Sequence, residues 1–134
     1  MSKLNIVIAT HGKFGEEIIK SAEMIVGKMD NIKSVSLIPS MSFEDFTKEA
    51  NTVLSDLSGD TLVLVDLYGG TPCNVFTALT KKYNHNVITG LNLPMLIDLY
   101  INTNDSSDVN VKEVIENCIS ILKTSCVHTN TMLD

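Results

Sequence analysis

Residues 61–72 read TLVLVDLYGGTP and span a complete strand-to-helix junction. The apolar and β-branched run from Thr61 to Val65 predicts a strand that is buried on both faces. Asp66 ends this run and a Gly-Gly turn follows it. Thr71-Pro72 then predicts a helix start, because threonine is a preferred cap and proline suits the first helical turn. A buried strand leading into a helix is typical of a parallel sheet covered by helices.

The same alternation extends toward the N-terminus. Leu4 to Ala9 is a second continuous apolar run and predicts another buried strand. Helical spacing of apolar residues follows over Phe14 to Val26. A short strand is predicted from Val35 to Ile38, and Ser42 with Asp45 resembles the capping box of the next helix.

Toward the C-terminus the pattern continues in the same way. The helix that starts at Thr71-Pro72 is predicted to reach about Tyr83, and a strand is expected from Asn86 to Leu91. A short helix is predicted from Asn92 to about Ile101, and a last helix opens at Asn110. The tail from Cys126 to Met132 alternates weakly and is interpreted as a possible fifth strand.

Together these segments predict an α/β fold with a doubly wound, mostly parallel sheet flanked by helices. The expected strand order is 2-1-3-4 with a C-terminal edge strand, in one domain over residues 1–134. In this order the winding direction reverses between strands one and three. Ligands bind at such a reversal, just beyond the carboxyl ends of the strands.

The amino-acid composition excludes several classes of protein and of binding site. No apolar run approaches the roughly 18 residues of a membrane span, and the N-terminus lacks signal-peptide features, so a cytoplasmic location is expected. The net charge of −6 and the scattered lysines argue against nucleic-acid binding. Arginine is absent, which excludes a guanidinium clamp in cis. Three cysteines without C-x-x-C spacing fit neither a disulfide framework nor a zinc site, and no metal or cofactor is expected.

The reversal point should bring together the loops after strands one and three. The first loop holds His11 and the second begins at Asp66. A neutral imidazole has one protonated nitrogen and one lone pair. Asp66 is predicted to accept a hydrogen bond from Nδ1 of His11, which leaves Nε2 free as a nucleophile and stabilises positive charge on the ring.

The helix after Asp66 is predicted to bind phosphoryl oxygens, because helix N-termini present free amides to anions. Pro72 has no N–H, so Cys73 and Asn74 are the expected amide donors. The Thr71 hydroxyl is expected to cap the helix or to donate to the phosphoryl group. Gly70 and its preceding glycine should allow the backbone to approach closely.

The other histidines and the cysteine at this turn have simpler interpretations. His85 lies between a predicted helix and strand and is interpreted as a turn residue. His128 is expected to be exposed in the tail. Cys73 is interpreted first as a small packing residue rather than as a reactive thiol.

Three motifs in this order resemble one known family: residues 9–12 (ATHG), residues 66–72 (DLYGGTP) and residues 90–96 (GLNLPML). The chain is similar to enzyme IIA of the mannose/fructose/sorbose phosphotransferase family. The resemblance implies phosphorylation of His11, orientation of its ring by Asp66, and a role for Thr71 beside the phosphoryl group. It also implies a doubly wound homodimer that exchanges a C-terminal strand, here roughly Ser125 to Thr129.

The resemblance further implies the partners. The small carrier HPr would donate the phosphoryl group, and a IIB subunit would accept it. IIB phosphorylates the sugar as it enters through a membrane complex of IIC and IID subunits. Because the chain ends at Asp134, a separate IIA subunit is expected.

Two alternatives stay open. The phosphotransfer subunit of a dihydroxyacetone kinase shares the fold and a phosphohistidine, although a Met-Gly-Ser type of turn is expected there. A regulatory module that is read by its phosphorylation state is the other. A receiver domain is disfavoured, because Thr10-His11 stands where its acidic pair would lie. A mutase-type phosphatase is also disfavoured, because it would need an arginine in the position that Thr10 occupies.

Overall fold

The computed structural model describes residues 3–105 and 108–133. Within this part of the chain the sheet has four strands, all parallel, in the order β2-β1-β3-β4, so the predicted order is confirmed. The elements in chain order are β1 (Asn5–His11), α1 (Phe14–Val26), β2 (Ile32–Leu37), α2 (Phe43–Asp56), β3 (Thr61–Val65), α3 (Thr71–Ala78), the 3₁₀ turn η1 (Leu79–Lys81), β4 (His85–Ile88), α4 (Leu93–Thr103), α5 (Val111–Thr124) and the 3₁₀ turn η2 (Thr129–Met132).

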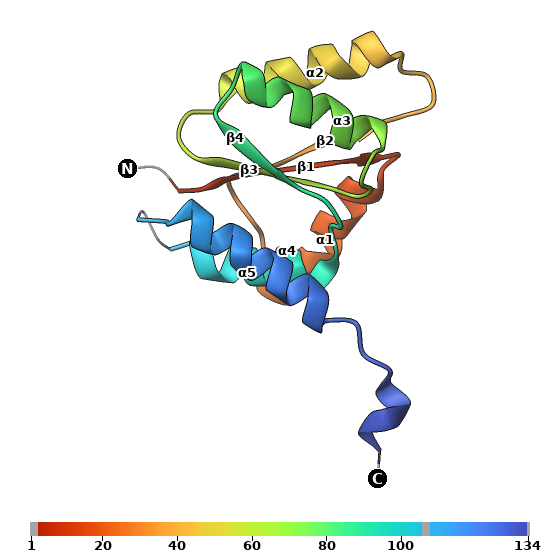
Figure 1. Ribbon diagram of the computed structural model, residues 1–134, viewed down its shortest axis with the longest axis vertical. Coiled ribbons are helices and arrows are strands. Elements are labelled where there is room, and N and C mark those ends of the chain that lie inside the picture. Colours follow the sequence, from red (N-terminus) through yellow and green to blue (C-terminus); the bar gives the residue numbers. More distant parts are fainter. Residues whose placement is uncertain (1–2, 106–107, 134) are drawn as a thin grey trace.

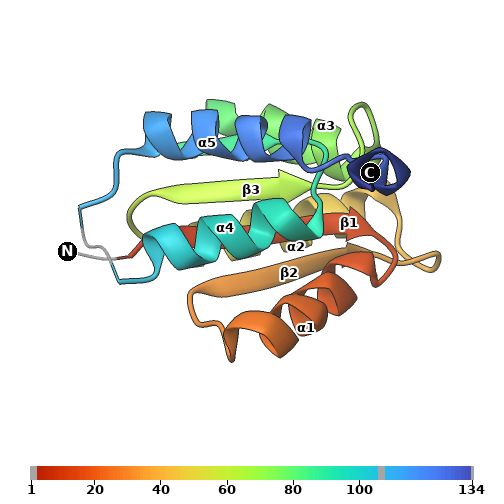
Figure 2. The ribbon, with the colours of Figure 1, turned by 90° about the horizontal axis from the view of Figure 1, so that it is seen from below.

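The helices form two layers around the sheet. Helices α2 and α3 cover one face, and α1, α4 and α5 cover the other (Figures 1 and 2). Each face of the sheet therefore has its own apolar core. All five residues of β3 are buried, as its continuous apolar run predicted, because this central strand meets a helical layer on both faces.

The helix starts largely follow the predicted signals. Ser42 and Asp45 form a reciprocal capping box at α2, and the Asn110 side chain accepts the Glu113 amide at the start of α5. The prediction that Thr71 caps α3 is wrong. Gly70 occupies the cap position with extended backbone, and Thr71 is the first helical residue.

The prediction that His85 is a turn residue is also wrong. It begins β4 and is buried, and its Nε2 lies 2.8 Å from the carbonyl oxygen of Phe76. The imidazole packs edge-on against the Phe76 ring. The sequence did not indicate this burial, because His85 stands between two polar residues, Asn84 and Asn86. Its hydrogen-bond partner, Phe76, lies in α3 and is identified only in the folded chain.

The predicted fifth strand is not formed in the part of the chain that the structure describes. The tail after α5 leaves the body of the domain, and Thr129 to Met132 form a 3₁₀ turn (Figure 1). Val127, Met132 and Leu133 are exposed there. A strand needs a neighbouring edge to pair with, and the tail runs away from the sheet of its own chain.

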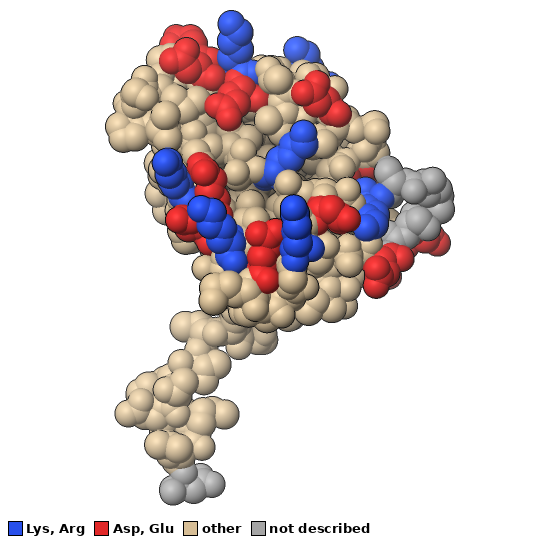
Figure 3. Space-filling model, turned by 180° about the vertical axis from the view of Figure 1, so that it is seen from behind, with Lys and Arg blue, Asp and Glu red and all other residues tan. Residues whose placement is uncertain are grey.

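The surface and the helices carry two further observations. None of the described helices is both long and apolar enough to cross a membrane. On the face in Figure 3, lysines and acidic side chains are interspersed, with no concentrated basic patch on that face. This distribution differs from the clustered basic face of a nucleic-acid binder.

Candidate functional site

The site lies at the carboxyl ends of two neighbouring strands. β1 and β3 are paired in parallel, with Ala9 opposite Val65, so the next residues of both strands emerge at the same edge of the sheet. β1 ends at His11, and Asp66 directly follows β3. The reversal of winding therefore brings together two residues that are 55 positions apart.

His11 and Asp66 make a paired contact through one carboxylate oxygen. Oδ2 of Asp66 lies 3.0 Å from the His11 backbone nitrogen and 3.0 Å from its Nδ1. An ionised carboxylate only accepts hydrogen bonds, so this contact favours the neutral tautomer in which Nδ1 carries the ring proton and Nε2 has a lone pair. The His11 side chain is 46% exposed and that of Asp66 only 15%. The Asp66 carboxylate is therefore largely shielded from solvent, whereas the His11 ring is accessible to another molecule.

The second carboxylate oxygen of Asp66 makes no competing contact. Oδ1 is buried and has no hydrogen-bond partner in the described part of the chain. The hydrogen bonds that this carboxylate accepts from the described residues therefore go to His11 alone. Among the described residues, the Asp66 carboxylate therefore makes hydrogen bonds to the end of β1 and none to a helix.

The two glycines of the β3–α3 turn have different roles. Gly69 adopts a φ of +81°, which favours glycine. Gly70 has an ordinary φ of −75°, but a Cβ at this position would lie 2.6 Å from Cε1 and 3.2 Å from Nε2 of His11. Gly70 is therefore needed because the backbone at the start of α3 packs directly against the imidazole.

The free amides at the N-terminus of α3 are not the two that were predicted. The Asn74 amide donates to the Gly70 carbonyl at 2.9 Å, and its side chain donates to the Gly69 carbonyl at 3.0 Å. The structure thus contradicts the expectation that the Asn74 amide faces a phosphoryl group. The amides of Thr71 and Cys73 and the Thr71 hydroxyl have no partner among residues 3–105 and 108–133. The Cys73 side chain is buried, as a packing residue would be.

An apolar surface beside His11 is a feature that the sequence interpretation missed. The β2–α2 loop forms an open groove of about 420 Å³ next to the ring. Leu67 and Tyr68 are exposed in the β3–α3 turn, and Tyr68 is 84% exposed. The sequence contained one signal for this groove, since Ile38-Pro39 stands at the end of a predicted strand. All strands of a parallel sheet end at the same edge, so this loop could be expected at the edge that holds His11. The groove is lined by His11, Gly12, Leu37, Ile38, Pro39 and Met41.

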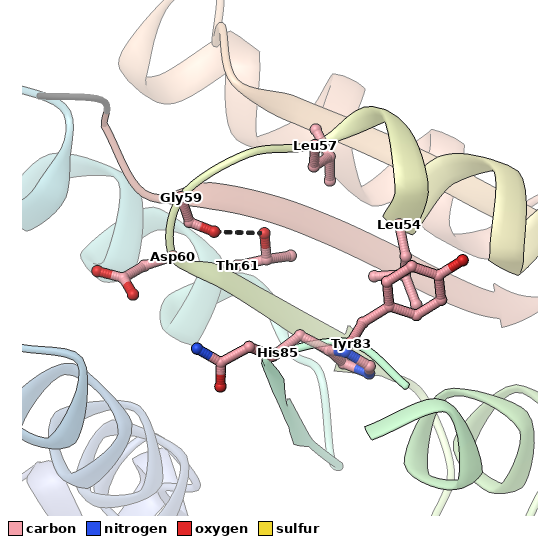
Figure 4. Close-up of a pocket in the computed structure, with 8 residues that line it drawn as sticks. Leu54, Leu57, Gly59, Asp60, Thr61, Tyr83 and His85 are labelled. Atoms are coloured by element: carbon pink, nitrogen blue, oxygen red, sulfur yellow. Dashed lines mark hydrogen bonds between the residues drawn. The ribbon is translucent and has the colours of Figure 1, made fainter. Parts of the chain in front are cut away.

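A second hollow lies at the opposite edge of the sheet. It has a volume of about 340 Å³ and includes Thr61 and His85, the first residues of β3 and β4 (Figure 4). None of the predicted site residues lines it. Among the described residues, no group of three histidine, cysteine or acidic side chains is arranged to hold a metal ion.

Comparison with known proteins gives consistent matches. A family model described as the fructose IIA component of the phosphotransferase system matches residues 5–119. The mannose-specific EIIAB component of Escherichia coli K12 is 34% identical over 103 residues, which are 75% of this chain and 32% of that protein. The chain therefore spans about a third of the length of that curated relative. The sorbose-specific EIIA component of Lacticaseibacillus casei is 28% identical over 106 residues, covering 78% of this chain and 77% of that protein.

A solved structure matches nearly the full length. The phosphotransferase system component EIIA from Streptococcus agalactiae superimposes with a TM-score of 0.86 at 30% identity. The match covers 96% of this chain and 98% of that one. The fold and the length of the matched unit therefore agree with those of an experimentally determined EIIA component.

Proposed function

The chain belongs to the mannose/fructose/sorbose family of IIA components of the phosphotransferase system, and we propose that His11 is the residue through which it carries a phosphoryl group. The observation that carries this proposal is the contact between Oδ2 of Asp66 and Nδ1 of His11 at the reversal point of the sheet. It leaves the solvent-exposed ring with one free lone pair, on Nε2.

The proposed step exchanges one phosphorus–nitrogen bond for another. The Nε2 lone pair of His11 attacks the phosphorus of phospho-HPr, the bond to the donor imidazole breaks, and its electron pair returns to that nitrogen. Nδ1 of His11 keeps its proton, so the ring becomes cationic and Asp66 stabilises the charge. Transfer to a IIB subunit runs the same chemistry in reverse, and water takes no part.

The phosphoryl oxygens have few charged partners available within this chain. With arginine absent from the sequence, the free amides of Thr71 and Cys73 and the Thr71 hydroxyl are the proposed donors. Gly70 packs against the ring, which places Nε2 at the positive end of α3. Neutral donors bind the group less tightly than guanidinium does, which suits a carrier that must release it.

The apolar groove and the exposed Leu67 and Tyr68 are the proposed docking surface for the protein partners. Both the donor and the acceptor must bring a phosphorus atom to the same Nε2, so they bind in turn rather than together. Exposed aromatic residues next to a reactive group are typical of protein interfaces. HPr and IIB are the proposed partners, and the proposed location is the cytoplasm. The membrane subunits IIC and IID would interact with IIB and not directly with this chain.

A homodimer is part of the same proposal. The exposed apolar side chains of Val127, Met132 and Leu133 have no cover in one copy. Exchange of roughly Ser125 to Thr129 onto a second copy would give that segment a sheet edge to pair with. Light scattering of the purified chain is expected to report a dimer, and a variant truncated after Thr124 is expected to be monomeric. A full-length monomer would refute this assembly.

The carrier proposal has a direct test. The chain is incubated with enzyme I, HPr and labelled phosphoenolpyruvate, and acid-labile, base-stable label is measured. His11→Ala is expected to abolish labelling, whereas His128→Ala, a matched change at a histidine outside the pair of His11 and Asp66, is expected to retain it. Label that persists in His11→Ala would place the phosphohistidine elsewhere. Failure to pass label to any IIB subunit would favour a regulatory module over a carrier.

A further inference from the structure

The residue before His11 is fully buried although it is polar. Thr10 has an exposed fraction of 0%. Successive side chains of a strand point to opposite faces. Thr10 therefore faces α1, while His11 faces Gly70 at the start of α3. A buried hydroxyl in this position needs hydrogen-bond partners, and these partners lie directly after the histidine, in the β1–α1 turn and the first turn of α1.

The Thr10 hydroxyl uses its donor capacity in the β1–α1 turn and its acceptor capacity at the first turn of α1. Its Oγ1 accepts the Gly15 amide at 2.8 Å, and it donates to the Gly12 carbonyl at 3.3 Å. Lys13 is the cap residue of α1 but makes no side-chain cap bond. Thr10 thus provides from the strand the acceptor that a cap side chain normally provides. One hydroxyl ties together the end of β1, the turn at Gly12 and the first turn of α1.

Close packing strengthens this connection. A Cβ on Gly15 would lie 3.1 Å from Oγ1 and 3.2 Å from Cγ2 of Thr10, so the first turn of α1 packs tightly on this side chain. On its other side, the Gly12 amide donates to the Leu37 carbonyl at 2.8 Å. The backbone on both sides of the His11 Cα is therefore held, although the ring itself is half exposed.

We propose that Thr10 is a positioning residue for phosphoryl transfer at His11. Its hydroxyl holds the loop in the conformation in which Nδ1 reaches Asp66 and Nε2 faces the start of α3. This inference rests on the proposed function of His11. Thr10 does not touch the transferred group and acts only through the backbone that carries the nucleophile.

The test compares variants that separate the hydroxyl from the methyl group. Thr10→Val keeps the branched shape and loses the hydroxyl, whereas Thr10→Ser keeps the hydroxyl. Thr10→Val is expected to lower kcat for phosphorylation by phospho-HPr by roughly ten- to a hundredfold, because misplacing a nucleophile by about 1 Å has effects of this size. KM for phospho-HPr should stay unchanged, because the exposed docking surface is intact. Thr10→Ser is expected to transfer at close to the normal rate.

A spectroscopic readout separates this role from simple stability. The imidazole nitrogen NMR shifts of His11 should report the Nδ1–H tautomer in the unmodified chain and a mixture of tautomers in Thr10→Val. Thr103→Val is the matched control, since Thr103 is buried, its hydroxyl donates to the Leu99 carbonyl at 2.7 Å, and it contacts no site residue. This control should change stability but neither kcat nor the tautomer.

Each remaining outcome has a defined meaning. Unchanged kcat and tautomer in Thr10→Val, or equal loss in Thr10→Ser and Thr10→Val, would overturn the role of the hydroxyl. If Thr10→Val does not fold, Thr10→Ser and Thr10→Ala make the same comparison, because both lack the methyl group and differ in the hydroxyl. If the unmodified chain takes no label from phospho-HPr, the proposed function fails, while the NMR spectra still decide the effect of Thr10 on the ring.

Discussion

Gly70→Ala places one methyl group against the nucleophile. The new Cβ would lie 2.6 Å from Cε1 of His11, whereas ordinary contacts begin at 3.4 Å. The ring must therefore retreat by about 0.8 Å, and it can do so because it is half exposed. That movement pulls Nδ1 away from Oδ2 of Asp66, to which it now lies 3.0 Å distant. We expect phosphoryl transfer to slow by roughly ten- to a hundredfold, the usual effect of a displacement of about 1 Å.

Stability should respond little to the same change. Gly70 has φ of −75° and ψ of 167°, a conformation that alanine adopts without strain. Glycine-to-alanine replacements at compatible positions change the free energy of unfolding by about 1 kcal/mol or less in the stabilising direction. The ring displacement offsets part of this gain. The melting temperature should therefore stay close to that of the unmodified chain.

Gly27→Ala provides the opposite pattern as a control. Gly27 follows α1 with φ of 83° and ψ of −178°, and a Cβ there would meet no atom within 4 Å. This backbone conformation is costly for alanine, by about 1–3 kcal/mol. The two measurements are rapid-quench transfer from labelled phospho-HPr and thermal unfolding. Gly70→Ala should transfer slowly and unfold at a normal temperature, whereas Gly27→Ala should transfer at a normal rate and unfold at a lower temperature. Normal transfer in Gly70→Ala would refute the argument that this glycine is kept for the ring.

Three other predictions concern single groups. Asp66→Asn removes the charge opposite the cationic ring and should slow transfer roughly ten- to a hundredfold with unchanged circular dichroism; a normal rate would exclude the carboxylate from the mechanism. Burial, and to a lesser extent Asp98, raises the pKa of Cys118 to about 11, so iodoacetamide at neutral pH should label exposed Cys126 well before Cys118 in mass-spectrometric mapping. Hydrogen bonds from Ser42 hold the pKa of Asp45 below its ordinary value, so the stabilisation that this carboxylate gives the fold is present above that ordinary value and is lost as pH falls through the lowered pKa. Asp45→Asn should flatten the dependence of unfolding on pH in that acid range, and an unchanged slope would contradict the capping box.

Local signals predicted most elements well. The predicted bounds Phe14 to Val26 match those of α1, because a helix that packs on one face repeats its pattern within the segment itself. Phe14 and Ile25, which belong to the predicted apolar stripe, are nevertheless exposed. The capping box at Ser42 was equally readable, since its two partners are three residues apart. β2 begins at Ile32, before the predicted start, because an edge strand shows a weaker apolar run.

Predictions that depend on distant partners were less successful. Asn74 looked like a free donor, but its position in the first turn of α3 commits its amide to Gly70. The weakly alternating tail was interpreted as a strand, yet a strand cannot form without an edge to pair with. The groove of the β2–α2 loop was missed because its one signal, the position of Ile38-Pro39 at the end of a strand, indicates the edge of the sheet but not that the loop lies beside His11.

The alternation of strands and helices could be predicted from the sequence alone. So could the strand order, and with it the edge of the sheet at which His11 and Asp66 meet. These follow from periodicity and from the handedness of crossovers, which are properties of the chain read in order. The contact of Gly70 with the His11 ring and the hydrogen bond from Gly15 to the Thr10 hydroxyl became visible only in the folded chain. Those facts depend on ångström-scale contacts between segments far apart in the chain, and such distances arise only when the helices pack on the sheet.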